Sequence, residues 1–83
     1  MKVWDAYLVH DEPEEAGVAQ RELGYYPTKR RAIQAVNDGR NEYWQTGGVV
    51  AGELEPAVPG VRPGHFESII GQSWFIGTDG RAE

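Results

Sequence analysis

The sequence predicts an α+β domain in which a small antiparallel sheet of three to four strands carries one main helix packed on one face. Three observations support this fold class. Apolar residues alternate with polar ones near both ends of the chain, as in strands that bury one face. The middle of the chain has the spacing of an amphipathic helix. The 83 residues suffice for one domain, so residues 1–83 are expected to fold as a single unit.

The first strand is expected within residues 1–10, where β-forming residues alternate between two faces. One face carries Trp4, Ala6 and Leu8. The other face carries Val3, Asp5, Tyr7 and Val9. This second face is not fully polar, so if it is exposed it forms an apolar patch that marks an interface with a partner or a second copy of the chain. Long loops that cover it are the alternative.

Residues 11–24 admit two interpretations. As a helix they would begin at Asp11, whose side chain can cap the first turn, and they would stop at Gly24. As an extended region, residues 11–18 would form an acidic loop and residues 19–26 a second strand. The helical interpretation leaves an apolar stripe of only Ala16, Ala19 and Leu23. We therefore favour the loop and the strand.

The clearest helix spans residues 28–39. Thr28 provides an N-cap side chain, and the run Asn37-Asp38-Gly39 is typical of a helix C-terminus. The buried stripe is expected to consist of Ala32, Ile33 and Val36. Beyond it, residues 40–48 favour a further turn of helix that the glycine pair Gly47-Gly48 would end.

The rest of the chain is predicted to form two strands joined by a stiff loop. Residues 49–54 form the first strand, and residues 56–64 form a loop with three prolines and two glycines. Residues 65–77 form the second strand. One face of it would carry Phe66, Ile70, Trp74 and Ile76, and the other face Ile69 and Phe75. Residues 78–83 are expected to be a frayed tail.

Composition restricts how the domain can be stabilised and where it resides. The chain has no cysteine, so it forms neither a disulfide nor a thiolate zinc site. Its core must come from branched residues and from three Trp, four Tyr and two Phe. No apolar run approaches the roughly 20 residues that cross a bilayer, and no secretory signal follows Met1. We expect a soluble, cytoplasmic protein with no membrane partner.

No pattern of residues indicates catalysis, a cofactor or a metal, so the chain is predicted not to be an enzyme. His10 precedes Asp11 and Glu12, but consecutive residues of an extended chain point to opposite sides. A metal site would require His65 to meet a distant carboxylate. The serines of the last predicted strand lack the glycine pattern of a nucleophile elbow, and no glycine-rich phosphate loop is present.

The net charge of −5 argues against a partner bound through its phosphates and favours a protein with a basic surface. Carboxylates on a rigid surface can imitate the phosphates of a nucleic acid and occupy a basic groove. Neighbouring aromatic side chains would anchor such an interface. The candidate partner-binding residues are Asp11, Glu12, Glu14, Glu15, Tyr25, Tyr26, Glu53 and Glu55. An ordinary solvated acidic surface is the alternative.

Three cations occupy the first turn of the predicted helix, where the helix dipole is positive and disfavours them: Lys29, Arg30 and Arg31. Breaking a local rule in this way tends to mark function. With the free N–H groups of the turn, the cations form a candidate anion site for a phosphate or for carboxylates of a partner. Pairing with Glu12, Glu14, Glu15 or Glu22 is the alternative explanation.

A helix-turn-helix that binds nucleic acid is the rival interpretation of residues 23–33. Leu23 would close a first helix, and Gly24 would form the turn. The residues facing DNA would be Arg30, Arg31 and Gln34. Against this interpretation, Gln20 stands where the motif usually has alanine, and the net charge is negative.

The acidic residues also carry a resemblance to a class of proteins. They are the run Asp11, Glu12, Glu14 and Glu15 and the pair Glu53 and Glu55. With its small size and its lack of catalytic groups, the chain resembles the single-domain inhibitors of phages and mobile elements, such as anti-CRISPR and anti-restriction proteins. The resemblance implies a viral protein that binds a CRISPR effector or nuclease at its nucleic-acid-binding surface. We thus predict a non-enzymatic, protein-binding inhibitor.

Reversing charge with Glu14→Lys and Glu15→Lys is expected to weaken the complex with a basic partner. Association should slow by at least about tenfold at low salt, because opposite charges accelerate the encounter of two proteins. Surface plasmon resonance at several salt concentrations measures both rates. An affinity and a salt dependence equal to those of the unchanged chain would contradict the acidic-surface mechanism.

Overall fold

The computed structural model describes residues 1–10, 19–61 and 63–82. Over these residues it contains four strands and one helix. In chain order the elements are β1 (Lys2–His10), β2 (Ala19–Tyr26), α1 (Lys29–Gly39), β3 (Thr46–Leu54) and β4 (Phe66–Ile76). The predicted α+β class, an antiparallel sheet with one helix on one face, is confirmed.

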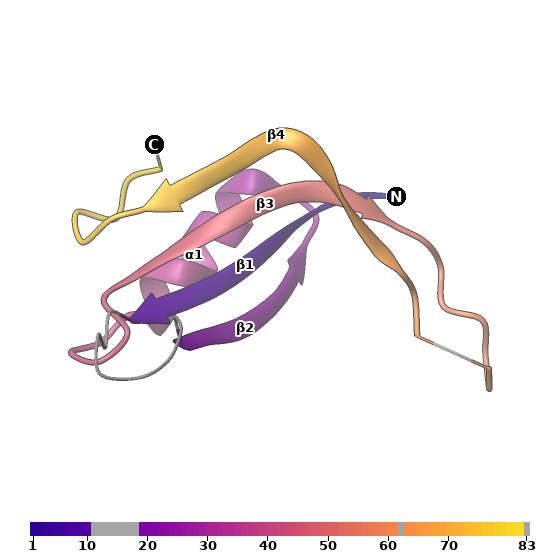
Figure 1. The fold of residues 1–83 in the computed structure, drawn as a ribbon, viewed down its shortest axis with the longest axis horizontal. Helices are drawn as coiled ribbons and strands as arrows, with labels where there is room; N and C mark the ends of the chain where they lie inside the picture. Colours follow the sequence, from indigo (N-terminus) through magenta and orange to yellow (C-terminus); the bar gives the residue numbers. More distant parts are fainter. Residues whose placement is uncertain (11–18, 62, 83) are drawn as a thin grey trace.

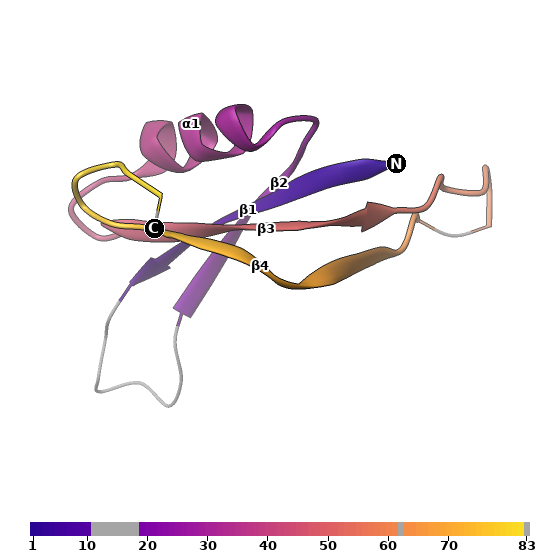
Figure 2. The same cartoon turned by 90° about the horizontal axis from the view of Figure 1, so that it is seen from above.

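The sheet has the strand order β2-β1-β3-β4, and each neighbouring pair is antiparallel. α1 connects the edge strand β2 to the inner strand β3 (Figure 1). It lies across one side of the sheet, which we call the helix face (Figure 2). The other side is the open face, and no helix or strand of the described residues covers it (Figure 2).

The core lies between the helix face and α1. Alternation along β1 places Ala6 and Leu8 on the helix face as predicted, and both are buried against α1. Burying a leucine or valine side chain contributes about 1.5–3 kcal/mol. The buried cluster consists of Ala6, Leu8, Ala32, Val36, Val49 and Ile76. Ile33, the third member of the predicted helical stripe, is only partly buried.

β2 occupies Ala19–Tyr26, so this part of the chain is extended, as the loop-and-strand interpretation predicts. Residues 11–18, the other part of that interpretation, lie outside the described residues. The register with β1 shifts between Ala6 and Tyr7, which leaves Leu23 as an extra residue. The side chain of Leu23 packs against the core on the helix face.

α1 begins and ends as its sequence predicts. The side-chain oxygen of Thr28 accepts a hydrogen bond from the backbone N–H of Arg31 at 3.1 Å, which satisfies one free donor of the first turn. The helix ends at Gly39, and the N–H of Arg40 donates to the carbonyl of Val36 at 3.1 Å. With 11 residues α1 is short, and no helix of the described part of the chain could cross a membrane.

The further turn of helix predicted for residues 40–48 is wrong. The Asn41 side chain accepts hydrogen bonds from the backbone N–H groups of Tyr43 and Trp44, at 2.8 and 2.9 Å. An asparagine that binds the backbone two and three residues ahead forms a turn in place of a helix. β3 then begins at Thr46, so the glycine pair lies inside a strand.

The two glycines are needed in β3 because other groups occupy the space of a side chain. A Cβ at Gly47 would collide with the carbonyl oxygen of Tyr7, and it would lie 2.8 Å from a methyl of Val36. On the open face, the ring of Tyr7 lies against Gly48. The glycines therefore bring α1 and a tyrosine ring into contact with the strand backbone.

The predicted faces of the last strand are partly wrong. Trp74 lies opposite Val49, on the helix face. Phe66 instead lies over Gly52, on the open face. The cause is a large bulge in which residues 69–72 of β4 stand opposite one residue of β3, with Gly71 at a φ of 80°. The alternation of β4 therefore restarts after the bulge, and Ile70 is 99% exposed.

The residues after β4 are held in place, so the predicted fraying of residues 78–83 is wrong for residues 78–82. The chain turns and returns to pair Ala82 with Ile76. The Asn37 side chain donates to the carbonyl of Gly80 at 3.1 Å, and the Arg40 guanidinium donates to the carbonyl of Thr78 at 2.6 Å. These bonds fix the turn against the end of α1.

Gly47→Ala is expected to destabilise the fold by about 1–3 kcal/mol, because the new methyl group meets a backbone oxygen that cannot move aside. Gly48→Ala should cost less, since the tyrosine ring that it meets can rotate. Urea unfolding measures both. Gly77→Ala is the control: its Cβ would lie 3.4 Å from the Asp79 side chain, an ordinary contact. Equal stability of the Gly47 and Gly77 variants would contradict this packing.

Candidate functional site

The structure separates the predicted partner-binding residues. Tyr25 lies opposite Asp5 on the open face and is 47% exposed, whereas Tyr26 packs against the core on the helix face. Glu53 is exposed near the end of β3, and Glu55 follows that strand. The acidic residues Asp11, Glu12, Glu14 and Glu15 lie outside the described residues.

Tyr25 and Glu55 meet at one hollow of about 410 Å³. The hollow lies at the base of the hairpin that projects from the sheet between β3 and β4 (Figure 1). It is lined by Met1, Tyr25, Leu54, Glu55, Pro56, Ala57, Pro63 and Gly64. The wall is mostly apolar, with one carboxylate at its margin.

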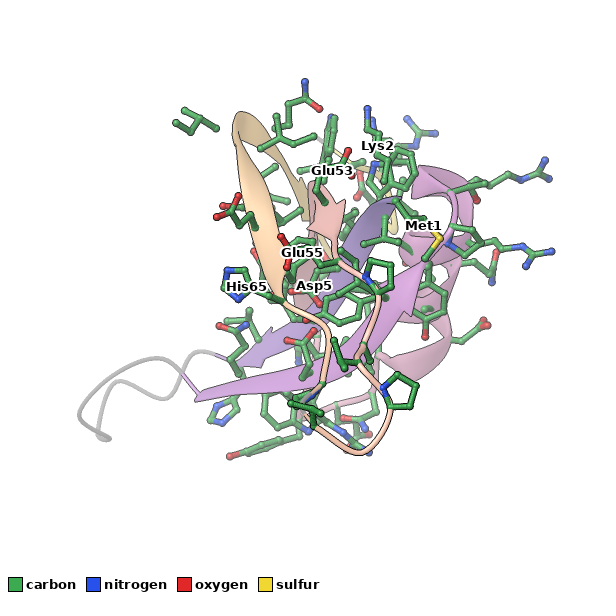
Figure 3. All side chains as sticks on the ribbon, turned by 90° about the vertical axis from the view of Figure 1, so that its right-hand side faces the viewer. Met1, Lys2, Asp5, Glu53, Glu55 and His65 are labelled. Atoms are coloured by element: carbon green, nitrogen blue, oxygen red, sulfur yellow. The ribbon has the colours of Figure 1, made fainter. Side chains whose placement is uncertain are left out.

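Glu53 and the chain terminus fix one side of this hollow. The Met1 amino group lies 3.1 Å from the Glu53 carboxylate and donates to the carbonyl of Leu54 at 3.2 Å. The N–H of Leu54 in turn donates to the carbonyl of Met1 at 2.9 Å. Figure 3 views the molecule from this end, with Met1, Glu53 and Glu55 labelled. Both Met1 and Glu53 are largely exposed, so the ion pair itself adds little stability.

The open face carries aromatic rings that lie against glycines. Phe66 covers Gly52 and stacks on Tyr25, with ring centroids 5.1 Å apart and an angle of 28° between the planes. Tyr7 covers Gly48 in the same way. Further along β4, Phe75 is 51% exposed. The open face is thus an aromatic surface that the described residues leave partly accessible to a partner.

The open face of the sheet carries no lysine or arginine of the described residues. The strand registers place two charged side chains of the described strands on the open face, Asp5 and Glu22, and both are acidic. The lysines and arginines of the described residues lie on the helix face, on α1 or in the turn beside it. They are Lys2, Arg21, Lys29, Arg30, Arg31, Arg40 and Arg81.

The basic first turn of α1 has a partly structural explanation. The Lys29 amino group lies 4.0 Å from the centroid of the Trp74 ring, a cation–π contact that holds it on the sheet. Arg30 and Arg31 are exposed and form no ion pair with a described acid; Glu22 lies on the other face. The pairing with Glu22 is therefore not formed. An anion site at Arg30 and Arg31 stays a prediction.

The helix-turn-helix interpretation is wrong. It requires a helix that closes at Leu23, but residues 19–26 form β2, paired with β1 along its length. Gly24, the residue of the proposed turn, lies inside this strand. No first helix is therefore available to support α1 across a DNA backbone.

The two histidines lie in different surroundings. His10 is buried at the end of β1, where its ring lies 4.1 Å from that of Tyr43 and 4.7 Å from that of Trp44. His65 is exposed on the hairpin, 3.9 Å from the Glu67 carboxylate. Among the residues that the structure describes, no group of three or more His, Asp or Glu side chains is placed to hold a metal ion.

Sequence analysis placed Asp5 and Tyr7 on a face that could form an interface, but it named neither of them, nor Phe66, as a partner-binding residue. Their arrangement depends on the strand register and on the glycines beneath the rings, neither of which alternation reveals. A signal was present, because Gly48 and Gly52 interrupt a strand that otherwise favours β structure. Glycine inside a strand often marks a place where another group approaches the backbone.

Comparison with known proteins supplies no relative: no family model, no curated protein and no solved structure matches the chain.

Burial raises the pKa of the Glu22 carboxyl above its usual 4.5, although the N–H of Gly24 donates to the carboxylate and acts in the opposite direction. The folded state therefore holds this proton more tightly than the unfolded chain does. The stabilisation that the protonated Glu22 carboxyl contributes to the fold is fully present below pH 4.5, and it is lost as the pH rises through the raised pKa.

Glu22→Gln removes this titration. The variant should gain stability over the natural chain as the pH rises above 4.5, and the difference should vanish below that value. Urea unfolding midpoints on both sides of this pH measure the effect. A glutamine variant that is less stable at neutral pH would show that the carboxylate makes a favourable contact in the folded state.

Proposed function

We propose that the chain is a non-enzymatic protein-binding module that engages a basic surface of its partner through the open face and the adjoining hollow. The observation that supports this most directly is the combination of aromatic rings with charges of one sign. Tyr25, Phe66 and Phe75 lie on the same side of the sheet as Asp5 and Glu22, and the lysines and arginines of the described residues lie elsewhere.

Each part of this surface has a distinct role in the proposal. Partly exposed aromatic rings that are already held in place lose little entropy on binding and act as anchors. The carboxylates attract a cationic partner and orient it. The two longer dimensions of the molecule, 39 and 28 Å, extend across the view of Figure 1. A molecule of this extent can supply the roughly 800 Å² per partner of a standard interface.

A second copy of the chain is a poorer occupant of this face than a basic protein. Two copies related by symmetry would bring the same acidic surface together, and Asp5 and Glu22 of each would repel those of the other. A nucleic acid is disfavoured for the same reason, because its phosphates would meet carboxylates. The partner class is therefore a protein with a cationic surface. The nucleic-acid-binding groove of a defence or nucleic-acid-processing complex is an example, and binding there would make the chain an inhibitor.

The test is affinity capture from the source cells with the natural chain and two matched variants. Tyr25→Ala removes an exposed ring from the open face, and Tyr43→Ala removes a ring of similar exposure, 53%, from the loop after α1. We expect a basic protein, identified by mass, to be retained by the natural chain and by Tyr43→Ala. Titration with the purified partner should show that Tyr25→Ala weakens binding about 30-fold, the loss of one anchor residue worth about 2 kcal/mol.

Three outcomes would contradict the proposal. The first is that no protein is retained specifically by the natural chain. The second is that the retained protein presents an acidic surface. The third is that the two tyrosine variants bind the partner equally well, because an interface on the open face requires Tyr25 and does not involve Tyr43.

A further inference from the structure

Asp5 is a carboxylate at the centre of the sheet, and one of its oxygens has no partner in the part of the chain that the structure describes. It lies on β1 between Tyr25 of β2 and Val50 of β3. Its Oδ1 atom is buried and has no hydrogen-bond partner among the described residues, although the residue as a whole is partly exposed. A buried carboxylate oxygen that nothing satisfies lowers the stability of a fold. Its presence here requires an explanation that the fold does not supply.

Two aromatic groups flank Asp5 along the strands. On the open face, β1 and β3 pair Val3 with Gly52, then Asp5 with Val50, and then Tyr7 with Gly48. Asp5 therefore lies between the two pairs that contain a glycine. Gly52 lies under the ring of Phe66, which stacks on Tyr25. Gly48 lies under the ring of Tyr7. The carboxylate therefore lies between two aromatic groups that cover glycines of β3.

The described residues provide no cation to neutralise this carboxylate, because their lysines and arginines lie on the other side of the sheet or in the turn beside α1. A second acid, Glu22, pairs with Tyr7 on the same face. A positive charge that arrived here would interact with both acids.

We propose that Asp5, Tyr7, Tyr25 and Phe66 form a socket that receives one arginine side chain of the partner. A guanidinium donates paired hydrogen bonds to a carboxylate and stacks its flat face on aromatic rings, so it matches both components of the socket. A lysine ammonium is compact and strongly hydrated, and it gains less from flanking rings. The socket rests on the proposed function, since it names the chemical group by which the basic partner is recognised.

Arginine binding can be tested without the partner. N-acetyl-argininamide is titrated into the labelled protein while its backbone amide signals are followed by NMR. We expect saturable shifts, in the millimolar range, for the amides around Asp5, Tyr7 and Gly52. The citrulline analogue, which has the same shape without the charge, should give no saturable shift. Asp5→Asn should weaken arginine binding at least about tenfold, and the control Glu42→Gln, an exposed acid in the loop after α1, should not.

The socket would be overturned by an equal response to the lysine analogue, by shifts confined to the helix face, or by undiminished binding to Asp5→Asn. If partner binding depends on Tyr25 while arginine does not bind, the proposed function stands and the socket fails. If arginine binds at Asp5 but no basic protein is captured, the socket stands and the proposed function fails.

Unfolding of the free protein gives a second readout. If Asp5 is kept for binding, Asp5→Asn should unfold at the same or a higher urea concentration than the natural chain, because an unsatisfied charge is removed. If Asp5 instead has a structural role, the same variant should unfold at a clearly lower concentration. The second result would overturn the socket even if arginine bound weakly nearby.

Discussion

Close contact of side chains with the glycines of β3 is the constraint on which both sides of the sheet depend. On the helix face Gly47 lets Val36 of α1 approach the strand. On the open face Gly48 and Gly52 lie under aromatic rings from the two neighbouring strands. A side chain at any of these positions would separate the layers or displace a ring, because interiors are packed to the density of organic crystals. One strand thus determines how the core closes and how the binding surface is shaped.

The sequence predicts the fold where one periodicity continues without interruption. Alternation along β1 and the capped stripe of α1 gave the right faces, because burial on one side repeats every second or every third to fourth residue. Prediction failed at Asn41, whose side chain replaces a helical turn, and at the bulge around Gly71, which resets the alternation of β4. Both depend on local hydrogen bonding or backbone geometry that alternation does not encode.

The candidate site could be predicted only in part for a related reason. Composition indicated an acidic, aromatic interface, and Tyr25 and Glu55 do line one hollow. Strand register decides which other residues join Tyr25 and Glu55. It pairs Asp5 with Tyr25, although 20 positions separate these two residues in the chain. The basic turn of α1 is explained in part by the contact of Lys29 with the Trp74 ring. Pairing between distant parts of the chain thus places Asp5 in the candidate site, and the contact with Trp74 gives Lys29 a structural role.

The central claim is that the open face is the surface that a partner covers. Hydroxyl-radical footprinting of the natural chain, alone and in complex with its captured partner, tests it most directly, because exposed aromatic side chains occur on both sides of the fold. We expect oxidation of Tyr25 and Phe75, on the open face, to fall in the complex while that of Tyr43 stays unchanged. Protection of Tyr43 with continued oxidation of Tyr25 and Phe75 would contradict the claim.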